Sequence, residues 1–437
     1  TGAGGVNAAA RPLGLWSAIA LVAGNMVGSG VFLLPASLAP YGALSLYGWA
    51  ITLAGALLLA ITFSRLAARG ARAGGPYAYA REAFGDTVGF TIAWSYWISI
   101  WCANAAIAVA FAGSVGALFP ALVATPARGA ALALAALWLC AAVNLAGVRE
   151  AGRAEVLTTV LKLLPLLLFG GVAIWWLDPA NFADTPRAIA AAAQAGAPAT
   201  VAGAVQATVA LALCSLLGLE AATIPAGAIH DAERTIPRAT LIGTLLAGVA
   251  TLLACTAVLG LLRPDAAMAS TAPMADAARA LWGPAAGVAI AIVAAISCLG
   301  ALNGWVLLSA QLPMAAAEDG LFPRRFARRD ARGTPRFGVW VGALLASALV
   351  VAKYSGPLGE VYTFSILLST AATLLPYVFS AAAWLRLGRH GRIAAALALL
   401  YGLYALVGTG REALLWGAAL VAAGLPLHAW RRLRAAR

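Results

Sequence analysis

The chain has 437 residues, 62% of them hydrophobic and only 10% charged, with a mean hydropathy of +0.89. This composition excludes a soluble globular domain and favours a polytopic helical membrane protein, because apolar stretches of about 20 residues recur along it. The net charge of +13 does not indicate nucleic-acid binding, since most basic residues lie in short connections between apolar stretches. Five cysteines and three histidines are too scattered to predict a disulfide framework, a metal site or a bound cofactor.

Hydropathy predicts an all-α fold with twelve membrane spans, within a single transmembrane domain that covers residues 1–437. We place the spans at 14–38, 43–67, 87–118, 129–148, 155–177, 200–229, 238–262, 284–312, 337–353, 358–385, 393–409 and 411–430. The connections after odd-numbered spans hold only six basic residues: Arg128, Arg187, Arg263, Arg279, Lys353 and Arg411. Basic residues mark cytoplasmic connections, so we expect both termini and the even-numbered connections in the cytoplasm, and the chain in the plasma (inner) membrane.

The first span is broken in its middle by Gly24, Asn25 and the triplet Gly28-Ser29-Gly30. Glycine destabilises a helix interior by about 1 kcal/mol relative to alanine, so the triplet favours local unwinding. Unwound backbone at membrane depth is tolerated only around protein or water, and its free N–H groups can hold a carboxylate. The alternative is close helix packing through small residues.

A second interruption is expected in span 6, where Gly218 and the intramembrane acid Glu220 precede Pro225. Broken segments at matching places in two halves point to a transporter with inverted repeats. We therefore expect a first five-helix repeat over 14–177, a second repeat of opposite orientation over 200–385, and two additional helices over 393–430.

Three segments resemble the amino acid–polyamine–organocation superfamily: GNMVGSGVFLLPASLA from Gly24, GGPYAYAREAFG from Gly74 and CLGALNGWVLLSAQLPMAAAEDGLFP from Cys298. The nearest branch is that of the basic amino acid/polyamine antiporters, which includes arginine–agmatine exchangers. The resemblance implies the LeuT-type five-plus-five fold, transport by alternating access and a possible homodimer.

The resemblance also implies roles for single residues. Ser29 and Gly30 would bind the substrate carboxylate, the substrate amino group would lie on backbone carbonyls, Trp305 would be the middle gate and Asn25 would stabilise the first break. The carbonyls would be those of Met26, Cys214 and Leu217. The side-chain end of the substrate would contact Ser99, Ile100, Asn104 and Ser369. The cytoplasmic-side gate would consist of Tyr96, Glu220 and Tyr377.

Two residues depart from the arginine–agmatine pattern. Cys214 stands where that exchanger has a tryptophan, so a cation–π contribution of about 0.5–2 kcal/mol is missing. Lys162 in span 5 resembles the neutral and broad-range permeases of the superfamily, where a lysine takes the place of a sodium ion. Lys162 could load and release a proton, or its side chain could snorkel to the cytoplasmic surface.

We expect a proton-linked carrier, not an enzyme, because no nucleophile–base pair or metal cluster is visible. A small or medium neutral L-amino acid is the first expectation for the substrate. The alternative is exchange of a basic amino acid for its amine, as in an arginine–agmatine or lysine–cadaverine antiporter. Protons and membrane lipid are the other expected partners. The arginine-rich run 324–336 is read as a topology signal, with a specific anionic-lipid site as the alternative.

Overall fold

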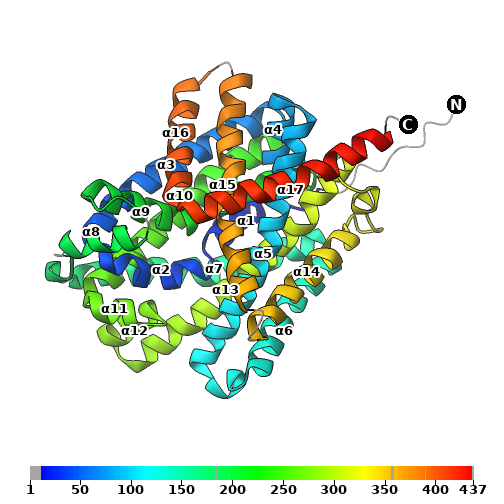
Figure 1. Ribbon diagram of the computed structural model, residues 1–437. Coiled ribbons are helices and arrows are strands. Elements are labelled where there is room, and N and C mark those ends of the chain that lie inside the picture. The colour runs from blue at the N-terminus through cyan, green and yellow to red at the C-terminus, as the bar shows by residue number, and fades with distance from the viewer. Residues whose placement is uncertain (1–10, 183–184, 196, 356–358, 389, 436–437) are drawn as a thin grey trace.

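Each of the twelve predicted spans coincides with one helix, or with helices joined at a break, in the computed structural model (Figure 1). The structure describes residues 11–182, 185–195, 197–355, 359–388 and 390–435. In chain order the spans correspond to α1 (Leu15–Met26) with α2 (Gly30–Leu38), α3 (Leu44–Arg69), α5 (Asp86–Leu118), α6 (Pro126–Ala146), α7 (Val148–Ala173), α9 (Val201–Cys214), α10 (Ala232–Leu261), α13 (Pro284–Glu318), α14 (Arg336–Tyr354), α15 (Gly359–Leu387), α16 (Arg392–Gly408) and α17 (Arg411–Ala435).

Eight stretches among the described residues are long and apolar enough to cross a bilayer: α1 with α2, α3, α5, α6, α7, α10, α13 and α14. The short helix α9 is followed by turns. The helices α16 and α17 pass the same test only as a pair bent by 108°. In Figure 1, α17 accordingly runs obliquely across the other helices. The protein is thus a polytopic helical membrane protein.

Shorter helices that hydropathy does not reveal lie in the connections. They are α4 (Pro76–Phe84), α8 (Thr185–Gln194), α11 (Pro264–Ala269) and α12 (Pro273–Trp282). The prediction also starts span 5 too late, at 155, whereas α7 begins at Val148. Its first turns carry charges, including an ion pair between Arg153 and Glu150 at 2.9 Å, and these lower the local hydropathy although the backbone is helical.

The connections separate into two groups at opposite ends of the bundle. Before α1, the N–H of Leu13 donates to the carbonyl of Ala228 at the end of span 6 (3.0 Å), so the two broken spans run in opposite directions. At the same end, Arg332 donates to the last turn of α6 (3.1 Å). At the other end, Arg187 of α8 forms an ion pair with Asp265 of α11 (3.0 Å). The N-terminus and the even-numbered connections thus contact one another, and the odd-numbered connections contact one another.

Candidate functional site at two broken helices

The first break lies between Met26, where α1 ends, and Gly30, where α2 begins. The hydroxyl of Ser297 on α13 donates to the carbonyl of Val27 at 2.9 Å and fixes this irregular backbone. Ser29 precedes α2, is half-buried and makes no side-chain cap bond to the helix. The N-terminal end of α2 carries a positive partial charge, so this segment has the chemistry of an anion site.

The second break follows Cys214, the last residue of α9, and continues as turns to Glu220. Gly218 has a φ of +111°, a conformation that residues with a side chain rarely adopt. A Cβ atom on Gly218 would lie 2.9 Å from the Cβ of Asn25, so the two breaks pack directly against each other. Leu217 in the second break is half-buried, and the side chain of Cys214 is not among those that the structure describes.

The structure brings together the three residues predicted to form a gate. Glu220 is fully buried, and Tyr96 of α5 donates a hydrogen bond to its Oε1. Tyr377 of α15 donates to its Oε2 at 2.5 Å and accepts from the N–H of Gly218 at 3.0 Å. One carboxylate therefore connects spans 3, 6 and 10 beside the second break.

Two buried amides in the same region lack partners. Neither the side-chain nitrogen nor the oxygen of Asn25 or Asn104 forms a hydrogen bond with the described residues. An unsatisfied buried polar group costs about 1–3 kcal/mol, so a ligand that supplied partners would recover that free energy. The indole of Trp305 donates to the carbonyl of Asn25 (3.4 Å), and Ser369 donates to that of Ser99 (2.9 Å). The other predicted residues, both buried, are Met26 and Ile100.

Lys162 points into the bundle, so the snorkelling alternative is wrong. Its side chain is fully buried, and its Nζ donates to the carbonyl of Gly24 at 2.5 Å. A Cβ atom on Gly300 of α13 would lie 3.2 Å from the same Nζ. The ammonium thus lies between α13 and the C-terminal end of α1, where a cation stabilises the negative end of the helix dipole.

Glu155 is a functional candidate that the sequence reasoning missed. Its side chain is 1% exposed, and its Oε2 accepts a hydrogen bond from Asn303 at 3.0 Å. Its Oε1 has no hydrogen-bond partner among the described residues and lies beside Gly24, whose carbonyl accepts from Lys162. The seven-residue spacing, which is two helical turns, could have revealed that the two charges share a face of α7.

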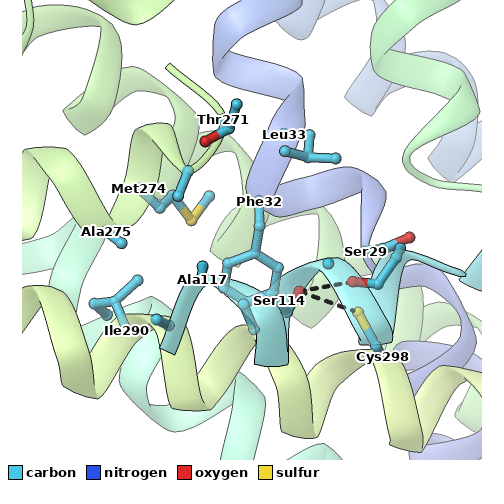
Figure 2. Close-up of a pocket in the computed structure, with 15 residues that line it drawn as sticks. Ser29, Phe32, Leu33, Ser114, Ala117, Thr271, Met274, Ala275, Ile290 and Cys298 are labelled. Carbon is cyan, nitrogen blue, oxygen red and sulfur yellow. Dashed lines mark hydrogen bonds between the residues drawn. The ribbon is translucent and has the colours of Figure 1, made fainter. Parts of the chain in front are cut away.

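A cavity of about 220 Å³ lies beside the first break (Figure 2). It is enclosed by α2, α5, α12 and α13 and extends from Thr271, before α12, to Ser29. The ring of Phe32 points into it, and Ser114 and Cys298 meet across it with 3.9 Å between oxygen and sulfur. Of the predicted site residues only Ser29 lines this cavity, which reaches the break from the end that carries the odd-numbered connections.

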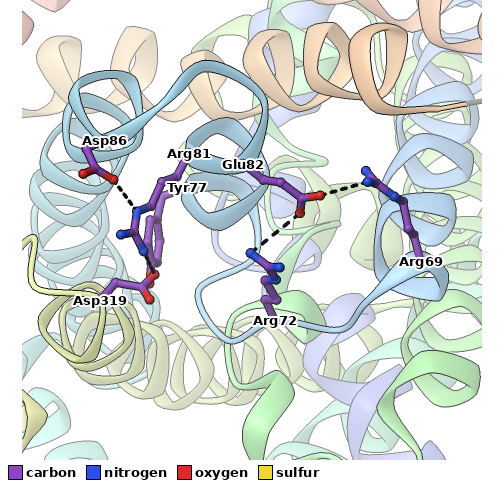
Figure 3. A network of polar contacts seen from close by, with 7 residues as sticks. All are labelled: Arg69, Arg72, Tyr77, Arg81, Glu82, Asp86 and Asp319. Carbon is purple, nitrogen blue, oxygen red and sulfur yellow. Dashed lines mark hydrogen bonds and ion pairs between the residues drawn. The ribbon is translucent and has the colours of Figure 1, made fainter.

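At the opposite end of the bundle, polar contacts join α4 to the C-terminal end of α13 (Figure 3). Asp319, directly after α13, accepts from Tyr77 at 3.1 Å and forms an ion pair with Arg81 at 2.9 Å. Arg81 also binds Asp86 at 2.7 Å, and this hydrogen bond raises the pKa of Arg81. Burial raises the pKa of Tyr77, so both groups keep their protons throughout the physiological range.

Comparison with known proteins places these features in a family context. The sequence profile of the amino acid permease family matches residues 13–424. The chain is 32% identical to the cadaverine/lysine antiporter of Escherichia coli K12, over 85% of this chain and 82% of the relative. It is 28% identical to the putrescine transporter PotE of E. coli K12, over 92% of each chain. The chain is also 30% identical to a putative arginine/ornithine antiporter of Bacillus subtilis 168, over 84% of this chain and 82% of the relative.

Among solved structures, the fold matches the substrate-bound outward-open state of a Na⁺-coupled sialic acid symporter. The TM-score is 0.57, and the match covers 89% of this chain and 88% of the symporter. Sequence identity is only 12%, so this likeness concerns the fold alone.

Proposed function

Because this chain belongs to the amino acid permeases of the amino acid–polyamine–organocation superfamily, we propose that it exchanges a basic amino acid for a diamine across the membrane. The geometric observation that carries a bound substrate is a pair of buried amides without partners among the described residues: Asn25, which packs against Gly218 of the second break, and Asn104 of α5. The protein would move its substrate by alternating access without changing it chemically, and so would not be an enzyme.

The choice of a cationic substrate follows the second of the two alternatives drawn from the sequence. The relatives named above carry cadaverine, lysine, putrescine, arginine or ornithine in their names. The first expectation, a neutral amino acid, rested on Cys214 and Lys162. A fixed ammonium at Lys162 remains the feature that favours it, and the experiment below distinguishes the two.

In the proposed complex, Ser29 and the N-terminal end of α2 hold the carboxylate of the amino acid. The carbonyls of Met26, Cys214 and Leu217 accept from the α-amino group, and Trp305 covers the aliphatic chain. A diamine has no carboxylate, so its binding relies on acceptors at both ends: the carbonyls at one and the amide oxygen of Asn104 at the other.

We propose that Glu220 and Lys162 couple transport to protons. Protonation of Glu220 would weaken the hydrogen bonds that it accepts from Tyr96 and Tyr377, and the gate would then open. Lys162 would respond to the charge of Glu155 and to the position of α1. We expect Lys162→Ala to abolish the response of uptake to a pH gradient in proteoliposomes, and an unchanged response would exclude this role.

We further propose the complete twelve-span arrangement with five-plus-five inverted repeats, both termini in the cytoplasm, and a homodimer in the inner membrane. The opposite directions of the two broken spans support the inverted repeat. The grouping of the even-numbered connections at the end where basic residues concentrate supports the orientation.

Counterflow tests the proposed function. Proteoliposomes loaded with unlabelled lysine are given radiolabelled cadaverine outside, with parallel loads of ornithine, arginine, alanine or buffer. We expect rapid label uptake with the basic amino acids and little with alanine or buffer. Equal uptake with alanine would favour a neutral amino acid carrier, and equal uptake into buffer-loaded vesicles would exclude exchange. Glu220→Gln should slow exchange, whereas Glu233→Gln, at an exposed acid on α10, should not.

A further inference from the structure

The connection from α13 to α14 forms a groove lined by arginines. Its volume is about 360 Å³, and we call it the arginine groove; its lining residues are Arg325, Arg328, Arg329, Asp330, Arg336 and Phe337. Four cationic side chains thus face one acid. The carboxylate of Asp330 accepts the backbone N–H groups of Arg332 and Thr334, each at 2.9 Å, so it is engaged in shaping its own loop.

The arginines of this groove differ in their partners. Arg329 binds Glu318 through two nitrogens, at 3.1 and 2.5 Å, and is neutralised there. The other three guanidinium groups form no hydrogen bond or ion pair with any residue that the structure describes: Arg325, Arg328 and Arg336. Each guanidinium group presents several N–H donors in one plane. Unpaired guanidinium groups that converge on one groove can therefore donate hydrogen bonds to the oxygens of a phosphate group.

The backbone adds to this charge, because α14 begins at Arg336 and continues for 19 residues. The N-terminal end of a helix carries a partial positive charge that favours an anion. The groove therefore combines side-chain and main-chain attraction for one anionic group at the boundary of a helix long enough to cross the membrane.

The same helix presents an apolar face directly after the groove. Phe337, Trp340 and Leu344 lie on one face of α14 and are 37%, 45% and 57% exposed. The ring of Trp138 on α6 lies 5.2 Å from that of Trp340 and widens this face. An anion held in the groove would thus have an exposed apolar surface beside it.

We propose that the arginine groove binds the headgroup of one anionic phospholipid, whose acyl chains lie along Phe337, Trp340 and Leu344. The phosphate accepts from Arg328 and Arg336, and the N-terminal end of α14 faces it. Free phosphate would bind the arginines in the same way, but it would leave the exposed aromatic face of α14 uncovered. A lipid would fill the arginine groove with its headgroup and cover that face with its acyl chains.

Native mass spectrometry of the full chain in detergent tests this site. The protein is titrated with phosphatidylglycerol or phosphatidylcholine, and bound lipid is counted for the wild type, Arg328→Gln/Arg336→Gln and Arg324→Gln. Arg324 is an exposed arginine of the same loop outside the groove, so it controls for general surface charge. We expect one preferred phosphatidylglycerol, weakened about thirtyfold in the double variant, or about 2 kcal/mol. In Arg324→Gln the change should stay within about twofold.

Equal weakening by Arg324→Gln, or equal binding of the two lipids, would overturn the proposal. Inorganic phosphate provides the second comparison: displacement of the lipid by phosphate with no effect of Trp340→Ala on lipid binding would assign the groove to a free anion. Trp340→Ala should instead weaken phosphatidylglycerol alone. Should the double variant not fold, Arg328→Gln by itself supplies the comparison with Arg324→Gln.

Discussion

Replacing Lys162 by methionine removes the ammonium but keeps a side chain of similar length in the same place. The carbonyl of Gly24 at the end of α1 then loses its hydrogen-bond donor, and the buried carboxylate of Glu155 loses a nearby opposite charge. Removing one member of a buried charge pair costs about 3–5 kcal/mol, because the other charge stays buried and uncompensated. We therefore expect Lys162→Met to lower the free energy of unfolding by about this amount.

The double variant Lys162→Met/Glu155→Gln isolates the electrostatic part of that cost. Glutamine keeps the shape of Glu155 and can still accept the hydrogen bond from Asn303, but it carries no charge. Only the hydrogen bond to Gly24 is then lost, which costs about 1–3 kcal/mol. The double variant should therefore be about 2 kcal/mol more stable than Lys162→Met, although it carries one more substitution.

Thermal and chemical unfolding in detergent, followed by tryptophan fluorescence, measures this difference. Lys353→Met is the matched control, because Lys353 is the only other lysine and is exposed at the end of α14. It should lower Tm much less than Lys162→Met, since interactions of an exposed lysine are worth at most about 1 kcal/mol. A double variant no more stable than Lys162→Met would refute the reasoning, since it would show that Glu155 and Lys162 do not compensate each other.

Three further predictions concern the gate and the cavity. Glu220→Gln should flatten the pH dependence of exchange. An unaltered pH profile would show that Glu220 does not couple exchange to protons. Arg81→Gln removes the ion pair that joins α4 to Asp319 after α13, which is worth up to about 1 kcal/mol. Cysteine labelling from this end of the bundle should therefore become up to about fivefold faster, at every physiological pH because the pKa of Arg81 is raised. Unchanged labelling would show that this network does not restrict access from that end. Cys214→Trp should raise arginine affinity about 2- to 30-fold through a cation–π contact, and no gain in binding would contradict the placement of residue 214 at the substrate.

The helices and both breaks could be predicted because they follow from bilayer physics. Apolar length located the helices, and glycine at positions 28, 30 and 218 marked the irregular backbone. The orientation read from the arginines stays a prediction. The gate residues are different. Positions 96, 220 and 377 are far apart in the sequence, and only the family resemblance brought them together before the structure did.

The misses have a common physical cause. Helices that are apolar on most sides give no periodicity that says which face meets which neighbour, so the cavity residues Phe32, Ser114 and Cys298 were not anticipated. Glu155 was read as the edge of a span because charges lower hydropathy, although it is buried against α13. The contact of Asp319 with α4 links two connections far apart in the chain, and no local pattern encodes such a pairing.

The central claim is that the two broken helices hold the substrate between them. A structure of the purified protein determined with lysine tests it most directly. We predict the carboxylate of the ligand at Ser29 and the start of α2, its α-amino group on the carbonyl ends of α1 and α9, and its ammonium at Asn104. Lysine bound elsewhere, with Asn25 and Asn104 still without partners and the breaks unoccupied, would contradict the account.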